Sequence, residues 1–149
     1  HLSIRRQRQM CIRDRGFTSK SFFEKSHNIM IINPQQSEIE AQFNKVSKGF
    51  KEHFNKVPDL NGMLFIIGIQ ELGKGIRTFS KEEKQDLMHI ANCKVLSYGG
   101  YYTLDGQDAE GWPIWIPANP LPFLSLEEQE LMLKMYIVQY VETELGWEL

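Results

Sequence analysis

The 149-residue chain has only two cysteines, Cys11 and Cys93, and they lie far apart. Two distant cysteines do not make a disulfide framework, so the sequence favours a reducing compartment, and we expect a cytoplasmic protein. Long apolar runs are also missing, since the longest, residues 63–69, is interrupted by Gly68. It falls well short of the roughly 18 apolar residues that a membrane span needs, so no membrane partner is expected.

Several catalytic signatures are absent as well. The chain has no glycine-rich phosphate-binding loop, no Gly-x-Ser-x-Gly nucleophile turn and no Cys-x-x-Cys pair. These absences argue against the commonest classes of nucleotide-binding protein, serine hydrolase and thiol-disulfide oxidoreductase. They leave open whether the protein is an enzyme.

Charge is distributed unevenly along the chain. Residues 1–29 hold seven Lys or Arg and two acidic residues, whereas residues 30–149 hold ten basic and seventeen acidic residues. An acidic body repels a phosphate backbone, so we expect no nucleic-acid partner.

The basic N-terminal segment has an unusual composition. Residues 4–15 contain Met-Cys-Ile-Arg-Asp-Arg and resemble a translated sequencing adapter, of the kind found at the ends of reading frames assembled from metagenomic reads. We therefore expect residues 1–29 to be a non-native or disordered basic extension, and residues 30–149 to form a single helical domain starting at Met30. The alternative is a basic arm that contacts phosphate.

Apolar periodicity and capping signals predict four helices, at about residues 37–57, 63–72, 80–98 and 125–145. Ser37, Ser80 and Ser125 each precede a glutamate by three residues, which is the capping-box pattern. The run 63–72 has no polar face, so it is predicted to be a central helix, with a buried strand as the alternative. The sequence thus predicts an all-α fold, a four-helix bundle-like domain with mostly antiparallel neighbours.

An irregular aromatic and acidic insertion separates the third and fourth predicted helices. Gly99 and Gly100 end the third helix, and the stretches 101–104 and 112–116 are aromatic and β-branched. These stretches can pair as a short β-hairpin, in which Pro113 would have to lie on an edge or at a bulge.

Three groups of residues are candidates for a site. The first is a stripe on the third helix formed by Glu82, Asp86, His89 and Cys93, of which the last three are metal-ligand types. Ligands on successive turns of one helix do not converge easily on one ion, so the alternative is a solvated helix face with Cys93 in a secondary contact.

The second group is the acidic loop with Asp105, Asp108 and Glu110, flanked by Gly106 and Gly111. Three carboxylates in six residues suit a calcium-type oxygen site, although their spacing differs from that of the EF-hand loop. The alternative is a solvated acidic loop.

The third group is aromatic and consists of Tyr101, Tyr102, Trp112 and Trp115. If exposed, these rings would form a binding surface for a sugar or a partner peptide. The alternative is that they are core residues covering the open end of the bundle.

The stretches Gly-Ile-Gln-Glu-Leu-Gly at 68–73, Phe-Ser-Lys-Glu-Glu-Lys at 79–84, Gly-Tyr-Tyr at 100–102 and Asp-Ala-Glu-Gly-Trp-Pro at 108–113 resemble small bacterial proteins of unassigned function. The resemblance covers residues 30–149 and implies no activity. The leading hypothesis is a protein-interaction or assembly module, with a protein partner or a second copy of the chain. The alternative is a metal-dependent enzyme that uses the acidic loop or the His89 face. No cofactor is expected under the first hypothesis, and a divalent metal under the second.

Overall fold

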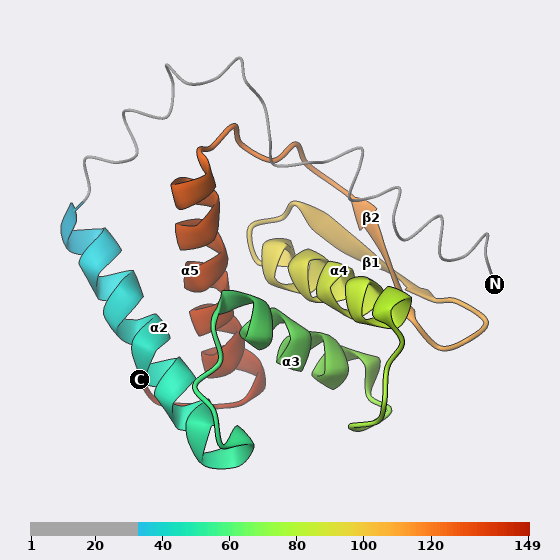
Figure 1. Cartoon of the computed structure of the whole chain (residues 1–149). Helices are drawn as coiled ribbons and strands as arrows, with labels where there is room; N and C mark the ends of the chain where they lie inside the picture. The colour runs from blue at the N-terminus through green and yellow to red at the C-terminus, as the bar shows by residue number, and fades with distance from the viewer. Residues whose placement is uncertain (1–32) are drawn as a thin grey trace. The chain divides into compact units, whose positions relative to one another are not determined.

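The computed structural model describes residues 33–149 (Figure 1). In this range the chain forms four helices and two strands: α2 (Asn33–Phe54), α3 (Leu60–Leu72), α4 (Lys81–Ser97), β1 (Tyr102–Gln107), β2 (Pro113–Pro117) and α5 (Leu126–Glu144). The described chain is therefore mostly helical with one two-stranded sheet, and the prediction of an all-α four-helix bundle is not confirmed. The predictions for residues 1–29 lie outside the described residues.

The contacts of the chain divide it into two compact units. We call residues 61–121 the hairpin unit, because it contains α3, α4 and the hairpin of β1 and β2. Residues 33–60 and 122–149 form the α2–α5 unit. The single domain expected from the sequence thus consists of two units by contact, and each is described by itself.

In the hairpin unit, α3 and α4 approach each other closely at Gly68. A Cβ atom added at Gly68 would lie 2.3 Å from the carbonyl oxygen of Leu87, so only glycine fits this contact. The predicted C-terminal end of α3 and the predicted start of α4 are confirmed, whereas α3 begins at Leu60, three residues before the predicted start. Gly73 follows α3 with a φ of 70°, and Ser80 caps α4 in a complete capping box with Glu83.

The predicted hairpin is also confirmed. Strands β1 and β2 pair antiparallel and both contact α4, which lies between α3 and the hairpin (Figure 1). The register pairs Thr103 with Ile116 and Leu104 with Trp115, and it shifts before Gln107. The shift is a β-bulge that places Asp105 and Gly106 opposite one residue of β2, and Gly106 adopts a φ of 100°.

The α2–α5 unit pairs the first and last described helices in the same direction (Figure 1). Glu40 Oε1 lies 3.0 Å from Nζ of Lys134. Further along, the ring centroid of Phe50 in α2 lies 4.9 Å from that of Trp147, which follows the end of α5. Contacts that advance together along both chains require parallel helices, so the expectation of mostly antiparallel neighbours is wrong for this pair. Since α2 and α5 are not consecutive helices, no short connection forces them to run in opposite directions.

The boundaries of α2 differ from the prediction at both ends. Ser37 lies within α2 instead of capping it, because the helix already includes Pro34, a residue suited to the first helical turn. At the other end Asn55 takes a φ of 57°, so the helix stops before Val57, which is exposed. By contrast, the predicted cap of α5 is confirmed, because Ser125 and Glu128 form a complete capping box.

Candidate functional site

The aromatic group lies mainly in the core. Tyr102, Trp112 and Trp115 are buried and Tyr101 is partly buried. Their rings give the short hairpin an apolar side against the rest of its unit, which is how a two-stranded sheet gains stability. Three of the four residues therefore present little surface on which a sugar or a peptide can stack.

The acidic loop is organised by one of its three carboxylates. Oδ1 of Asp108 accepts hydrogen bonds from the backbone N–H groups of Glu110 and Trp112, each at 2.9 Å. This is the turn-forming role that aspartate often plays in tight loops. The ammonium of Lys74, from the loop after α3, donates to the backbone carbonyl of Glu110. Asp105 is exposed on the strand before the loop.

The stripe on α4 is not a solvated face. Asp86, His89 and Cys93 are all buried, whereas Glu82 is exposed. The alternative of a solvated face is therefore wrong for Asp86 and His89, whereas Cys93 lies in a buried contact, as that alternative expects. Helix α4 contacts α3 at Leu87 and also contacts both strands of the hairpin, so it is covered on more than one side.

Within this stripe, the sulfur of Cys93 lies beside the imidazole of His89. Sγ is 3.8 Å from Nδ1 and 3.7 Å from Nε2, so neither nitrogen alone is aimed at the sulfur. A thiol activated by histidine needs one nitrogen directed at it and access for a substrate. Burial of both side chains gives no such access.

No metal-binding group is seen among the candidate ligands. Among the side chains that the structure describes (residues 35–52 and 55–149), no group of three or more from His, Cys, Asp or Glu is placed to hold an ion. The structure keeps Asp86, His89 and Cys93 together on α4, and Asp105, Asp108 and Glu110 together on the hairpin. In the acidic loop, Oδ1 of Asp108 already accepts two backbone N–H groups.

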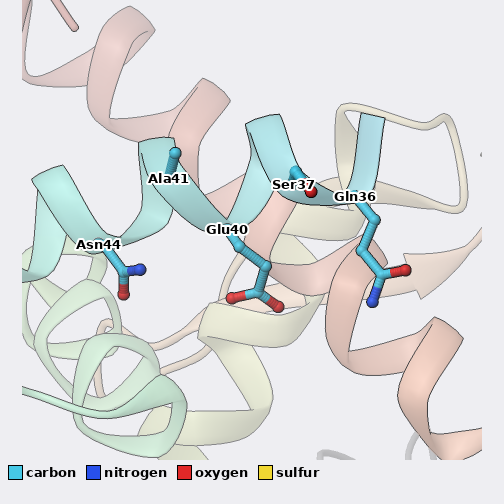
Figure 2. A pocket seen from close by; sticks show the side chains of 5 residues that line it. All are labelled: Gln36, Ser37, Glu40, Ala41 and Asn44. Atoms are coloured by element: carbon cyan, nitrogen blue, oxygen red, sulfur yellow. The ribbon is translucent and has the colours of Figure 1, made fainter. Parts of the chain in front are cut away.

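An open hollow on α2 is lined by Gln36, Ser37, Glu40, Ala41 and Asn44. Figure 2 shows that Gln36, Glu40 and Asn44 project to the same side of the helix, at intervals of four residues. Glu40 is paired with Lys134 of α5 within the same unit. Because residues of one helix form the whole lining, the hollow is a surface feature and does not enclose a ligand.

Three large apolar side chains of the hairpin unit are exposed, and those of Leu104 and Ile116 lie on opposite faces of the hairpin because they belong to successive cross-strand pairs. Ile76 is 77% exposed, Leu104 54% and Ile116 43%. Ile76 is in the loop after α3, Leu104 is on β1 and Ile116 is on β2. The sequence reasoning named none of them, because it concentrated on residues with chemically active side chains.

The backbone hydrogen bonds of the hairpin show at which residues the N–H and C=O groups point away from the other strand. The N–H of Ala118 donates to the carbonyl of Tyr101, and the N–H of Asp108 donates to the carbonyl of Trp112, each at 2.9 Å. These bonds flank the pairs Tyr102–Pro117 and Gln107–Pro113, and so identify both as non-hydrogen-bonded pairs.

The pair Leu104–Trp115 lies two residues from the first of these pairs, so it is also non-hydrogen-bonded. The backbone N–H and C=O of Leu104 therefore turn away from β2 toward the free edge of β1. On the free edge of β2, the outward positions are residues 113, 115 and 117, and two of the three are prolines without an N–H. Of the two edges, only that of β1 has an N–H at every outward position.

Comparison with protein-family models, with curated proteins and with solved structures finds no match to this chain. Among the helices of residues 33–149, none combines the length and the apolar character required to cross a membrane.

Proposed function

We propose that the chain is a cytoplasmic protein-interaction or assembly module that contacts another protein chain through the hairpin unit. The observation that carries the proposal is the exposure of Leu104 on β1, an edge strand in a sheet of only two strands. An exposed strand edge that carries a large apolar side chain is a place where a partner chain can add.

The placement of the other candidates supports the same proposal. Asp86, His89 and Cys93 are buried, and the carboxylate of Asp108 accepts two backbone N–H groups of its own loop. These titratable side chains are therefore buried or used within their own loop, whereas the apolar side chains of Leu104 and Ile116 are exposed. The partner proposed is a protein, since the acidic body of residues 30–149 disfavours nucleic acid.

Sedimentation velocity on the full chain tests this proposal. In buffer with a chelator, we expect the weight-average sedimentation coefficient to rise with concentration over the range of about 10 µM to 1 mM, the range of weak interfaces. A chain that stays monomeric over the whole range contradicts assembly through a second copy.

Metal analysis of the same samples distinguishes the alternative, a metal-dependent enzyme. We expect no stoichiometric divalent metal in the full chain or in its variants. The variants are His89→Gln for the α4 stripe and Asp105→Asn with Glu110→Gln for the acidic loop. The loop variant keeps Asp108, because removing that carboxylate would disturb the loop itself. A bound metal that is lost in either variant would support the enzyme hypothesis instead.

A further inference from the structure

We infer that the free edge of β1 pairs with the same edge of a second copy of this chain, with Leu104 beside its symmetry mate. The inference rests on the proposed function and names its partner and its contact. The resulting assembly would be a four-stranded antiparallel sheet built from two hairpins.

The backbone of Leu104 is placed to pair with another strand. Its N–H and C=O point away from β2, and within residues 33–149 the backbone of Leu104 has no hydrogen bond outside the hairpin. An exposed strand edge with a donor and an acceptor at one residue is a template for another strand. The prolines at residues 113 and 117 leave the edge of β2 much less suited to this role.

The position of Leu104 also allows a two-fold symmetric pair. A two-fold axis through an antiparallel β1–β1 pair requires a residue that can donate to and accept from its own copy. Leu104 meets this requirement, because a hydrogen-bonded pair of Leu104 with its mate forms two N–H···O=C bonds. The two leucine side chains then lie side by side, and each covers part of the 54% of Leu104 that is exposed.

The neighbouring residues fit the same register. With Leu104 opposite its mate, Thr103 lies opposite Asp105 of the second copy, so a hydroxyl donor meets a carboxylate acceptor on the outer face. Tyr102 lies opposite Gly106, which has no side chain to clash with the second copy. No carboxylate lies directly opposite another carboxylate.

The length of the pairing limits its strength. The bulge at Asp105 and Gly106 interrupts β1, so the new ladder is centred on residues 103–105 and is short. We therefore expect a weak dimer, with a Kd on the order of 100 µM. Extension from two to four strands stabilises the hairpin, since an isolated pair of strands is only marginally stable.

The test removes the outward donor and leaves the hairpin intact. In Leu104→Pro the lost N–H is one that β2 does not use, and proline is tolerated at such edge positions. Because the two-fold axis repeats the change in both copies, both central hydrogen bonds are lost. The Kd of the dimer, measured by sedimentation, should therefore rise about tenfold or more. Leu104→Val keeps the N–H and should still dimerise, and so should Ile76→Ser, which removes the more exposed Ile76 elsewhere in the unit.

Amide exchange of the unmodified chain gives a second readout, should the proline variant fail to fold. The amide of Leu104 should exchange more slowly in a concentrated sample than in a dilute one. The amide of Thr103, which faces Ile116 within the hairpin, should not change.

The outcomes separate the two proposals. A chain that dimerises equally well as Leu104→Pro, or whose Leu104 amide is unaffected by dimerisation, overturns the β1 contact and leaves the assembly function standing. A chain that is monomeric up to about 1 mM overturns the β1 contact and, with it, assembly through a second copy.

Discussion

The ionised carboxylate of Glu83 stabilises the start of α4. Its carboxylate accepts a hydrogen bond from the backbone N–H of Ser80 at 3.2 Å and pairs with Arg77 at 2.7 Å. The backbone hydrogen bond, followed by the interaction with Arg77, lowers the pKa of Glu83 below its ordinary value of 4.5. Because the ionised form is favoured in the folded state, this stabilisation is complete above the ordinary pKa and is lost as the pH falls through the lowered pKa.

We predict that Glu83→Gln lowers the free energy of unfolding by about 0.5–1 kcal/mol at neutral pH, the size of a partial loss of a helix cap. The difference from the unmodified chain should shrink in acid, where Glu83 itself becomes protonated. Urea unfolding followed by circular dichroism at neutral and acidic pH measures both values. Glu127→Gln is the control, since Glu127 is exposed in the first turn of α5 and lies outside the capping box there. A difference that grows in acid would contradict the assignment.

At the scale of the elements, the two helical glycines in close contact differ in what they meet. A Cβ at Gly68 would lie 2.3 Å from the backbone oxygen of Leu87, which moves only if α3 and α4 separate. A Cβ at Gly49 would lie 2.6 Å from the ring of Trp147, a side chain that can rotate away. A glycine-to-alanine substitution at each position therefore compares a contact with backbone, which cannot move locally, with a contact with a side chain, which can.

We predict that Gly68→Ala lowers the free energy of unfolding by about 2 kcal/mol or more, because overpacking at this crossing exceeds the helix propensity gained. Gly49→Ala should change it by no more than about 1 kcal/mol, since the gain of about 1 kcal/mol in propensity offsets the rotation of Trp147. Equilibrium unfolding of both variants under the same conditions gives the comparison. Equal costs would mean that the α3–α4 crossing adjusts as easily as a side chain.

Two of the helix caps and the hairpin could be predicted from the sequence. Ser80 and Ser125 were predicted as helix caps, and the hairpin from its aromatic and β-branched stretches, because these signals act between residues near one another in the chain. Ser37 has the same local pattern, yet α2 continues past it toward the N-terminus. A capping box permits a helix start but does not prevent an earlier one.

What could not be predicted depends on contacts between distant segments. Asp86 and His89 are buried on a helix that other elements contact on more than one side, and the periodicity of one helix does not reveal such cover. The parallel direction of α2 and α5 likewise depends on the path of the whole chain. For the candidate site, Pro113 pointed to a strand edge, but the outward direction of the Leu104 backbone required the register of the hairpin.

At the scale of the whole molecule, the two units differ in how the chain builds them. Within the described residues, the hairpin unit is one continuous segment, residues 61–121, whereas the α2–α5 unit joins two segments from either side of it. Pairing of α2 with α5 therefore closes a loop that contains the entire hairpin unit. Closing that loop costs less chain entropy when the intervening segment is already folded than when it is a flexible chain.

We predict from this connectivity that the α2–α5 unit opens at a free energy no higher than that of the hairpin unit. Native-state hydrogen exchange at increasing denaturant measures both, using fully buried positions on each side: Leu87 and Val95 of α4 against Ile137 and Val141 of α5. The α4 amides should be protected as long as or longer than the α5 amides, and Gly68→Ala should lower the protection of both groups. Protection of α5 that outlasts that of α4 would show that the discontinuous unit holds together without its connector, and that loop closure does not set the order of unfolding.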